Sequence, residues 1–382
     1  MKKKFIAVGL MSGTSLDGLD AVLARLAPSP SGFDVRVLGH VHRAFPHGWA
    51  EEIRRISERD RLRDAARFGA AWSEFAARTV RALLSRCRYS VRRVDVIGAH
   101  GQTVVHEPAP KRFLGKPSAI SIQLADLSRL AQRMGIPVVG NFRTADLAAG
   151  GQGAPLAPHA HRMLFGSRRK IVAVQNLGGI GNVTLLKNGK VTAAFDTGPA
   201  NVWIDTVARW RTKGKLTFDK NGATAARGNP DFPMVGALLR HPFLRVRPPK
   251  SAGWEQFGPA SLAKFRARLL KMPLADALAT VTVASALATA IAYRRFVLPK
   301  GNPSEILLCG GGARNATWRR LFAHALPEIP VTTTEARGLP VDQVEAVACA
   351  ILAVQTLRGF PSNEPTATGA ERPVILGQLA FL

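Results

Sequence analysis

The chain has 382 residues, of which 46% are hydrophobic and 21% charged, a composition that excludes disordered, fibrous and collagen-like proteins. Its length predicts two domains, or one large domain with two lobes and a ligand cleft between them. The cysteines Cys87, Cys309 and Cys349 lie far apart without a CxxC pair. This spacing excludes a disulfide scaffold and a zinc ribbon, and it fits a reducing cytoplasm.

The balance of charge is strongly basic. Lys and Arg number 53 against 26 Asp and Glu, which gives a formal net charge of +27. Such a surface attracts polyanions, including ATP and nucleic acid, and does so less as salt rises. The basic residues are distributed along the chain without one long tail, so an ordinary solvated surface is favoured and a polyanion-binding role remains the alternative.

Two apolar stretches resemble targeting or membrane segments. Residues 5–11 follow a basic cluster but are short and lack a small-x-small cleavage site, so they predict a first β-strand and not a signal peptide. Residues 277–293 are uncharged but contain several Thr and a Ser. They predict a buried Ala-rich helix, and no membrane association is expected.

The first part of the chain alternates strands and helices. Residues 5–10 and 19–27 predict two strands around a Gly/Ser/Thr/Asp turn, and residues 34–41, where apolar residues alternate, predict the third strand of an antiparallel meander. Residues 50–87 have apolar positions at helical spacing and predict one or two helices. Further elements are predicted as a strand at 94–100, a segment at 119–135 that enters a helix ending at Gly135, and a strand at 136–140. The alternation predicts a mixed α/β sheet covered by helices.

Residues 150–160 are rich in Gly and Pro and predict an irregular crossing between two lobes. The pattern then repeats in outline. The predicted elements are two strands around a glycine turn at 170–186, a strand and loop at 190–201, helices at 201–213 and 275–298, a strand before a triple glycine at 305–315, and a closing helix at 341–359.

Three glycine-bearing turns follow apolar strands, at 11–20, 176–182 and 309–315. Glycine lets backbone N–H groups approach phosphate oxygens closely, so each turn is a candidate nucleotide contact. A tight hairpin that needs a positive φ is the alternative for any one of them. The P-loop motif and the GxGxxG motif are both absent.

Phosphoryl transfer needs a carboxylate that orients or deprotonates the nucleophile. Acidic side chains in or near predicted loops are the candidates, namely Asp17, Asp20, Asp146, Asp196, Asp205 and Glu345. A loop carboxylate more commonly caps a helix or a turn. For Asp196 a catalytic role is favoured, since it follows an apolar strand and precedes a rigid Thr-Gly-Pro.

The histidines do not indicate a metal centre. His100 and His106 are six residues apart, and His159 and His161 are alternate residues, neither of which is a zinc-site spacing. Ordinary polar roles, or hydrogen bonding to a sugar, are favoured, and no metal ligands are predicted among the side chains. A GxSxG nucleophile motif is also absent.

Eight sequence blocks occur in the order seen in anhydro-N-acetylmuramic acid kinases, and the likeness runs from about residue 6 to residue 380. The blocks are GLMSGTSLDGLD, GAHGQTVVHEP, FRTADLAAGGQGAPLAP, NLGGIGNVTLL, FDTGPANVWID, PPKSAGWEQF, LLCGGGARN and TGAERPVILG. The resemblance implies an α/β fold of the actin-like, hexokinase-like ATPase type (ribonuclease H-like). That fold has two lobes of mixed sheets flanked by helices, with an ATP cleft between them. The lobes are expected at 1–150 and 151–382, with the last helix packing back on the first.

The resemblance also implies an activity. The family's enzymes use ATP and water to open the 1,6-anhydro ring of anhydro-N-acetylmuramic acid and to phosphorylate the freed O6. The product, N-acetylmuramate 6-phosphate, is recovered in peptidoglycan recycling. A cytoplasmic homodimer that uses ATP and Mg²⁺ is expected, with Mg²⁺ carried mainly by the phosphates and backed by a loop aspartate.

Site residues follow by motif match. Asp196 corresponds to the catalytic aspartate, proposed to take a proton from the attacking water. Arg143 and Glu345 correspond to sugar-binding positions. The nucleotide site is expected to include Gly13, Thr14, Ser15, Leu16, Asp17, Gly18, Leu19 and Asp20 at the phosphates, together with Gly178, Gly179, Gly310, Gly311 and Gly312.

Two departures from the family pattern are visible. Asn141 stands where the family usually has Asp, and Ala200 where Gly is usual. Both bear on substrate preference more than on fold. The alternatives are therefore a kinase for another sugar or anhydro-sugar on the same scaffold, and a polyanion-binding protein on an inactive kinase scaffold.

Overall fold

The computed structural model describes residues 4–13, 16–30, 32–59 and 61–382. The chain divides into two compact units. The first comprises Met1–Leu164 and Gln343–Leu382, and the second Phe165–Asp342. The chain therefore leaves the first unit once and returns to it. The expected boundary at residue 150 falls inside the first unit. The C-terminal segment was assigned to the second lobe with only its last helix packing back on the first, but all of Gln343–Leu382 is part of the first unit.

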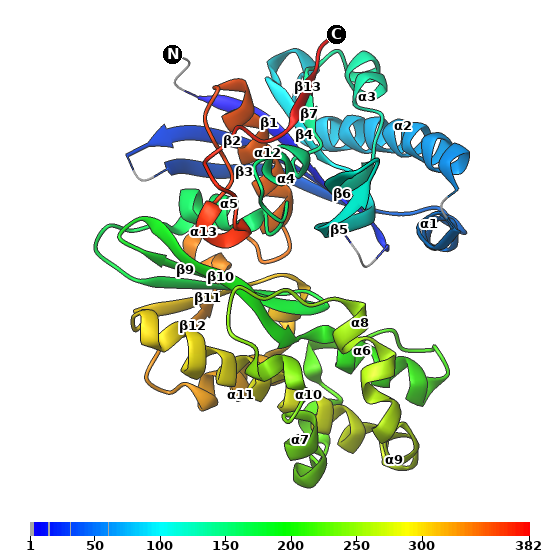
Figure 1. The fold of residues 1–382 in the computed structure, drawn as a ribbon, viewed down its shortest axis with the longest axis vertical. Helices are drawn as coiled ribbons and strands as arrows, with labels where there is room; N and C mark the ends of the chain where they lie inside the picture. Colours follow the sequence, from blue (N-terminus) through cyan, green and yellow to red (C-terminus); the bar gives the residue numbers. More distant parts are fainter. Residues whose placement is uncertain (1–3, 14–15, 31, 60) are drawn as a thin grey trace. The chain divides into compact units, whose positions relative to one another are not determined.

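The first unit is built on a six-stranded mixed sheet in the order β13-β7-β4-β1-β2-β3 (Figure 1). β1, β2 and β3 form the predicted antiparallel meander, β1, β4 and β7 run parallel, and β13 closes the edge antiparallel to β7. The strands are β1 (Phe5–Met11), β2 (Gly18–Ser29), β3 (Gly32–Ala44), β4 (Val96–His100), β7 (Val138–Gly140) and β13 (Gln378–Ala380).

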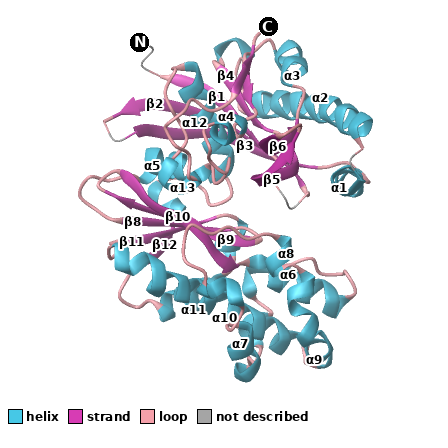
Figure 2. Ribbon diagram, in the orientation of Figure 1, coloured by secondary structure: helices cyan, strands magenta, loops and turns pink. Residues whose placement is uncertain are grey.

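Helices cover both faces of this sheet (Figure 2). On one face Trp72 and Phe75 of the long helix α2 share a hydrophobic core with Val8 and Leu10 of β1. The helices are α1 (Trp49–Arg59), α2 (Leu62–Arg86), α3 (Leu127–Met134), α4 (Thr144–Ala148), α5 (Ala157–Phe165), α12 (Val344–Leu357) and α13 (Pro365–Thr368).

α12 lies against β1 and β4 on the opposite face at very short range. Gly9 and Gly98 pair in register, and a Cβ on either would fall on a carbonyl oxygen of α12, that of Ala346 or of Cys349. These two glycines are therefore required by the close approach of helix to sheet.

A two-stranded sheet between β4 and α3 differs from the prediction. β5 (Gln102–Phe113) pairs with β6 (Lys116–Leu124) across a turn. The prediction had a strand ending at residue 100 and a segment at 119–135 entering a helix, with no strand pair between them, whereas helix α3 starts at Leu127. Asp126 caps α3 by accepting from the Arg129 N–H, and Gly135 ends it with a φ of +63° as predicted.

The second unit contains a five-stranded mixed sheet in the order β10-β9-β8-β11-β12. β9 runs against the other four strands, so the carboxyl ends of β8, β10, β11 and β12 lie along one edge. In open α/β sheets this edge is the usual location of ligand sites. The strands are β8 (Val172–Leu177), β9 (Ile180–Lys187), β10 (Lys190–Pro199), β11 (Glu305–Cys309) and β12 (Val331–Thr333).

The core of the second unit is organised around the Ala-rich helix α10, which packs against α6, α11 and β10. The segment Leu274–Lys300 is apolar and long enough to cross a membrane, but 72% of its apolar window is buried. It is a core helix, as predicted. The helices are α6 (Asn201–Thr212), α7 (Phe232–Leu238), α8 (Trp254–Phe257), α9 (Arg266–Lys271), α10 (Leu274–Ala292) and α11 (Ala316–Ala325). Both units thus have the predicted mixed sheets flanked by helices.

Candidate active site

Asp196 lies near the carboxyl end of the edge strand β10. Its backbone N–H donates to the Lys250 carbonyl oxygen (3.1 Å), and its Oδ2 accepts from the Ala252 N–H (2.7 Å). The side chain is only partly exposed. Burial raises the pKa of Asp196 to about 6, against the opposing effects of the Ala252 N–H and the Lys250 charge. A carboxyl group with this pKa can exchange a proton near neutral pH.

Strand register places the other predicted elements of this unit beside Asp196. Asp196 lies opposite Asn182, which lies opposite Asn176 of β8, and Asn176 lies opposite Cys309 of β11. Because neighbouring strands are about 4.8 Å apart, this row spans roughly 14 Å from Asp196 to β11. The glycine turns that follow β8 and β11 therefore lie at the same sheet edge as Asp196.

The turn Gly178-Gly179 is fastened to the first residues of α6. The Gly179 carbonyl oxygen accepts from the N–H groups of Ala200 (3.0 Å) and Val202 (3.1 Å), and the Gly178 carbonyl from that of Asn201 (3.1 Å). The Asn201 amide also donates to the Gly178 oxygen at 2.9 Å. Ala200, the departure from the family's glycine, has a φ of −110° and is buried, so its Cβ fits without a left-handed backbone.

The triple glycine after β11 packs against that same turn. Gly310 has a φ of +80°, and a Cβ there would fall on the Asn176 side chain. A Cβ on Gly312 would lie 2.7 Å from the Asn201 Nδ2 and 2.8 Å from the Leu177 Cβ. Gly311 is exposed and has no atom within 4 Å of a Cβ position. Packing thus explains why Gly310 and Gly312 lack a side chain, whereas the backbone of Gly311 is open to a ligand.

The first predicted phosphate turn connects β1 to β2 in the first unit. Thr14 and Ser15 lie outside the described residues. Gly13 is held by Gln102, whose Nε2 donates to the Gly13 carbonyl (3.3 Å) and whose Oε1 accepts from the buried Ser12 hydroxyl (2.6 Å). Ser12 and Gln102 were not predicted, although both flank motif glycines in the sequence.

The later residues of this turn are engaged differently. Asp17 is exposed, Leu16 has a φ of +56°, and a Cβ on Gly18 would meet the Arg43 carbonyl. Leu19 is fully buried in the core, so only its backbone could face a ligand.

Asp20 is engaged by two histidines of β3. Its Oδ1 contacts His40 Nε2 (2.9 Å) and His42 Nδ1 (3.1 Å). Burial opposes ionisation of Asp20, but hydrogen bonds from the two imidazoles prevail and lower its pKa. Asp20 is therefore a partnered carboxylate of the β2–β3 pair.

Arg143 and Glu345 are brought near each other within the first unit, since the Glu345 charge acts on the Arg143 guanidinium. Arg143 Nη1 donates to the Gly153 carbonyl (2.9 Å), and Nη2 lies 3.1 Å from His100 Nε2. Burial lowers the pKa of Arg143 to about 10, with Cys349 and Glu345 opposing. Burial and the Arg143 charge lower the pKa of His100 to about 3, so this imidazole is neutral.

The Arg143 Nε and the His100 Nδ1 are buried and have no hydrogen-bond partner among the residues that the structure describes, as expected where a ligand completes a polar site. Asn141, the second departure, has a φ of +53°, which Asn tolerates better than most residues. Its Nδ2 donates to Gln378 Oε1 (3.1 Å) and its Oδ1 accepts from Thr144 (2.5 Å). An aspartate could not make the first of these bonds.

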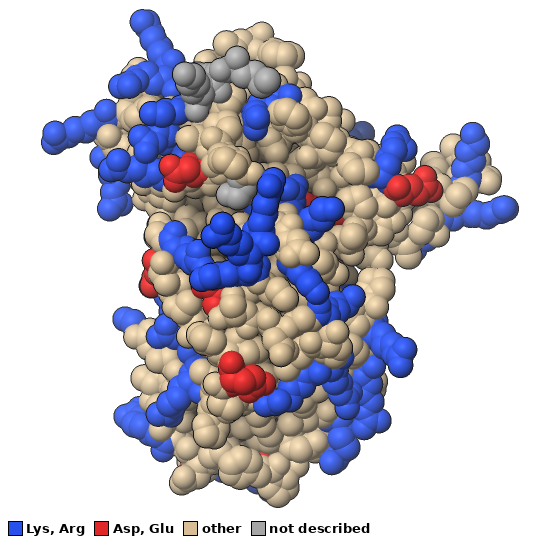
Figure 3. Space-filling view, turned by 90° about the vertical axis from the view of Figure 1, so that its left-hand side faces the viewer, with Lys and Arg blue, Asp and Glu red and all other residues tan. Residues whose placement is uncertain are grey.

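The described residues contain no group of three or more His, Cys, Asp or Glu placed to hold a metal ion. Lys and Arg are spread over much of the face drawn in Figure 3, with few acidic residues among them.

Comparison with known proteins decides the family. Residues 5–381 match the family model of anhydro-N-acetylmuramic acid kinase. The chain belongs to that family. Curated members include one from Caldanaerobacter subterraneus (36% identity, 100% of this chain and 98% of the relative). Another, from Salinibacter ruber, is 38% identical over 98% of this chain and 95% of the relative. A third, from a Picosynechococcus strain, is 40% identical over 97% of this chain and 98% of the relative.

Membership of the anhydro-N-acetylmuramic acid kinase family confirms the predicted activity. The chain is an ATP-dependent phosphotransferase that phosphorylates anhydro-N-acetylmuramic acid in peptidoglycan recycling. Two solved structures are similar in fold. The component A of (R)-2-hydroxyglutaryl-CoA dehydratase from Acidaminococcus fermentans covers 93% of this chain and 99% of its own at a TM-score of 0.48 and 11% identity. A glucokinase from Streptomyces griseus covers 92% of this chain and 99% of its own, at a TM-score of 0.39 and 15% identity. At these scores the likeness carries no conclusion about activity.

Proposed function

We propose that Asp196 is the general base of the kinase reaction. The observation that supports this role is the state of its carboxylate. Oδ2 is fixed by the Ala252 N–H, while no hydrogen bond within the described part of the chain engages Oδ1. A carboxylate that is anchored through one oxygen, open at the other and has a pKa of about 6 can orient a water molecule and accept its proton.

The proposed reaction balances in two linked steps. The water oxygen bonds to C1 of the anhydro-sugar, its proton passes to Asp196 Oδ1, and the C1–O6 bond breaks. The released O6 attacks the γ-phosphorus of ATP, the bond from that phosphorus to the β–γ bridging oxygen breaks, and ADP leaves. Positioning of the reactants supplies much of the rate enhancement, since the protein forms no covalent bond itself.

We assign ATP binding to the glycine turns. Backbone N–H groups of Gly13, Gly18 and the intervening residues would meet the phosphates, and the turns at Gly178-Gly179 and Gly310–Gly312 would complete the nucleotide site. The exposed Gly311 backbone supports a direct contact there.

Mg²⁺ fits this chain as an ion carried by the nucleotide. The described residues contain no group of three or more His, Cys, Asp or Glu that could hold a metal ion. Most ligands of the Mg²⁺ would therefore be phosphate oxygens and water, a common arrangement for this ion. Asp17, an exposed carboxylate of the first glycine turn, is the candidate loop aspartate behind it. The ion would neutralise charge on the transferring phosphoryl group.

Arg143 and Glu345 are assigned to sugar binding. The buried Arg143 Nε and His100 Nδ1, which lack partners within the described part of the chain, support a polar ligand at this point of the first unit. We further propose that the enzyme works as a cytoplasmic homodimer, as expected for the family.

The test is turnover of anhydro-N-acetylmuramic acid with MgATP in heavy-oxygen water, followed by mass spectrometry. Wild type should place the heavy oxygen on C1 and phosphate on O6. Asp196→Asn should lower kcat by about 10²–10⁴-fold while the circular dichroism spectrum is unchanged. Asp205→Asn is the matched control. Burial also raises the pKa of Asp205 to about 6, but Asp205 lies on helix α6 and not on strand β10. Full activity of Asp196→Asn would refute the assignment.

A further inference from the structure

Residues 250–252 lie along the free edge of β10. β10 is the outermost strand of its sheet, and the pairing with β9 shifts register between Asp196 and Gly198. At this irregular point the Asp196 backbone N–H donates to the Lys250 carbonyl oxygen, and the Asp196 Oδ2 accepts from the Ala252 N–H. Residues 250–252 thus fix both the backbone and the carboxylate of Asp196.

The Lys250 side chain is buried, at 7% exposure, in an unusual setting for an ammonium group. Its Nζ donates one hydrogen bond, to the Phe243 carbonyl oxygen (3.2 Å). The same atom lies 4.5 Å from the centre of the Phe243 ring, 4.9 Å from Phe296 and 5.9 Å from Phe195. Three aromatic faces thus stabilise the cation in place of a direct carboxylate partner.

No carboxylate lies within ion-pair distance of Lys250 in the described residues, but the Asp196 charge acts on it from further away. Burial lowers the pKa of Lys250 to about 8, with Asp196 opposing and Arg295 adding to the effect. Arg295 comes from the helical turn Tyr293–Val297, which also carries Phe296. An ammonium buried without a direct anionic partner is costly, and its field acts on the Asp196 carboxylate.

We propose that Lys250 is a positioning residue for the reaction: its caged ammonium keeps Asp196 ionised and its backbone anchors the segment that orients the carboxylate. The inference rests on the proposed role of Asp196 as base. Phe195, Phe243 and Phe296 then have a shared purpose, since they hold the cation near Asp196 without letting it form a contact pair that would occupy Oδ1.

The experiment compares Lys250→Met with Lys250→Arg over a range of pH, at saturating MgATP and sugar. For Lys250→Met the acid limb of kcat should move up by about one pH unit, because loss of a nearby positive charge disfavours the carboxylate. Activity relative to wild type should therefore be about tenfold lower at pH 5 than at pH 9. Lys250→Arg retains the charge and should keep the acid limb of wild type, whatever its kcat.

A loss of packing alone would lower kcat by one factor at every pH, so an unmoved acid limb in a folded Lys250→Met protein would overturn the proposal. A direct measurement separates this outcome from failure of the proposed function. The NMR signal of the Asp196 carboxyl carbon is identified as the one that is missing from the spectrum of Asp196→Asn. Its chemical shift is then followed over pH in wild type and in Lys250→Met. A higher pKa in the variant supports the coupling even if Asp196→Asn retains activity, and equal pKa values refute it.

Discussion

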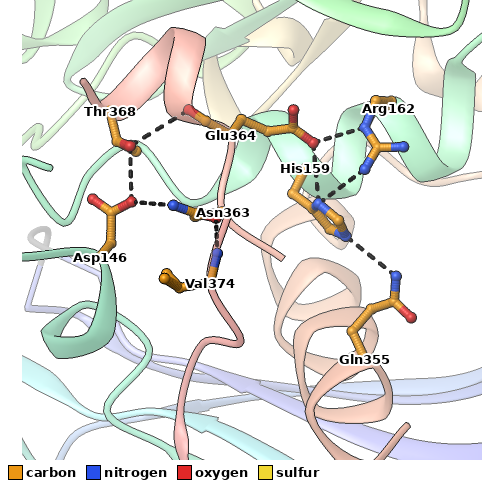
Figure 4. Close-up of polar contacts among 8 residues, drawn as sticks. All are labelled: Asp146, His159, Arg162, Gln355, Asn363, Glu364, Thr368 and Val374. Atoms are coloured by element: carbon orange, nitrogen blue, oxygen red, sulfur yellow. Dashed lines mark hydrogen bonds and ion pairs between the residues drawn. The ribbon is translucent and has the colours of Figure 1, made fainter. Parts of the chain in front are cut away.

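Asp146 offers the sharpest test of how the first unit is held together. Its side chain is fully buried and accepts three hydrogen bonds, of which Figure 4 shows the two from Asn363 and Thr368. Oδ1 accepts from Asn363 Nδ2 (2.8 Å) and from the Thr368 hydroxyl (2.8 Å), and Oδ2 accepts from the Gly153 N–H (2.8 Å). One carboxylate thus ties α4, the glycine-rich loop that follows it and the C-terminal segment.

Asp146→Asn has nearly the same shape but only one acceptor atom. In its better orientation the amide oxygen keeps Asn363 and Thr368, while the NH₂ group faces the Gly153 N–H, donor against donor. One hydrogen bond to a charged acceptor is lost, which costs about 1.5–3 kcal/mol of unfolding free energy. Asp146→Ala removes the acceptor of all three hydrogen bonds and should cost on the order of 5 kcal/mol.

Thr368→Val is the matched control, because it removes one donor and leaves Asp146 with two partners. It should cost about 1 kcal/mol. Urea unfolding of the full chain gives the free energies, with Trp72 in the core of the first unit as a fluorescent probe. Hydrogen exchange of the Gly153 amide should be faster in Asp146→Asn.

A change below about 0.5 kcal/mol for Asp146→Asn, or a smaller loss than for Thr368→Val, would refute this reasoning. A functional consequence is also expected. The Gly153 carbonyl accepts from Arg143, so the KM for the sugar should rise in Asp146→Asn more than the KM for ATP.

Two further predictions concern stability. Burial lowers the pKa of His100 and His161 from 6.5 to about 3, so between these pH values the unfolded chain binds more protons and acid favours unfolding. The unfolding free energy measured with urea should therefore fall as the pH drops below about 6.5, by up to about 1.4 kcal/mol per pH unit for each histidine, and a flat profile from pH 7 to 4 would contradict this. Gly312→Ala should destabilise the protein by about 1–3 kcal/mol, because its Cβ would press on Asn201 and Leu177. Gly311→Ala, with open space around its Cβ, should cost less than about 1 kcal/mol, and equal thermal midpoints for the two variants would be the contrary result.

Much of the fold could be predicted because its signals are local. Two stretches around a polar turn located β1 and β2, apolar alternation located β3, and the glycine turn located β8 and β9. The β5–β6 pair was missed, since its register shifts near Glu107 and Lys111 and its prolines break the alternation. The return of residues 343–382 to the first unit was anticipated only for the last helix, because β13 is too short to give a pattern.

The site was predicted unevenly for a similar reason. Asp196 stands out because its own neighbours in sequence are distinctive. Lys250 and Ala252 do not, although they bond to Asp196, because contacts between distant segments leave no spacing signal in one sequence. Gln102 and His100 flank Gly101, but their partners Ser12 and Arg143 are remote in the chain.

The discontinuous first unit has a consequence for synthesis on the ribosome. The second unit, Phe165–Asp342, is one continuous stretch and can complete its core as soon as it emerges. The first unit must wait, because α12 covers β1 and β4, and β13 pairs with β7. The earliest-made strands thus stay uncovered on one face until translation reaches the last 40 residues, Gln343–Leu382, and nascent chains stalled before that point should depend on chaperones.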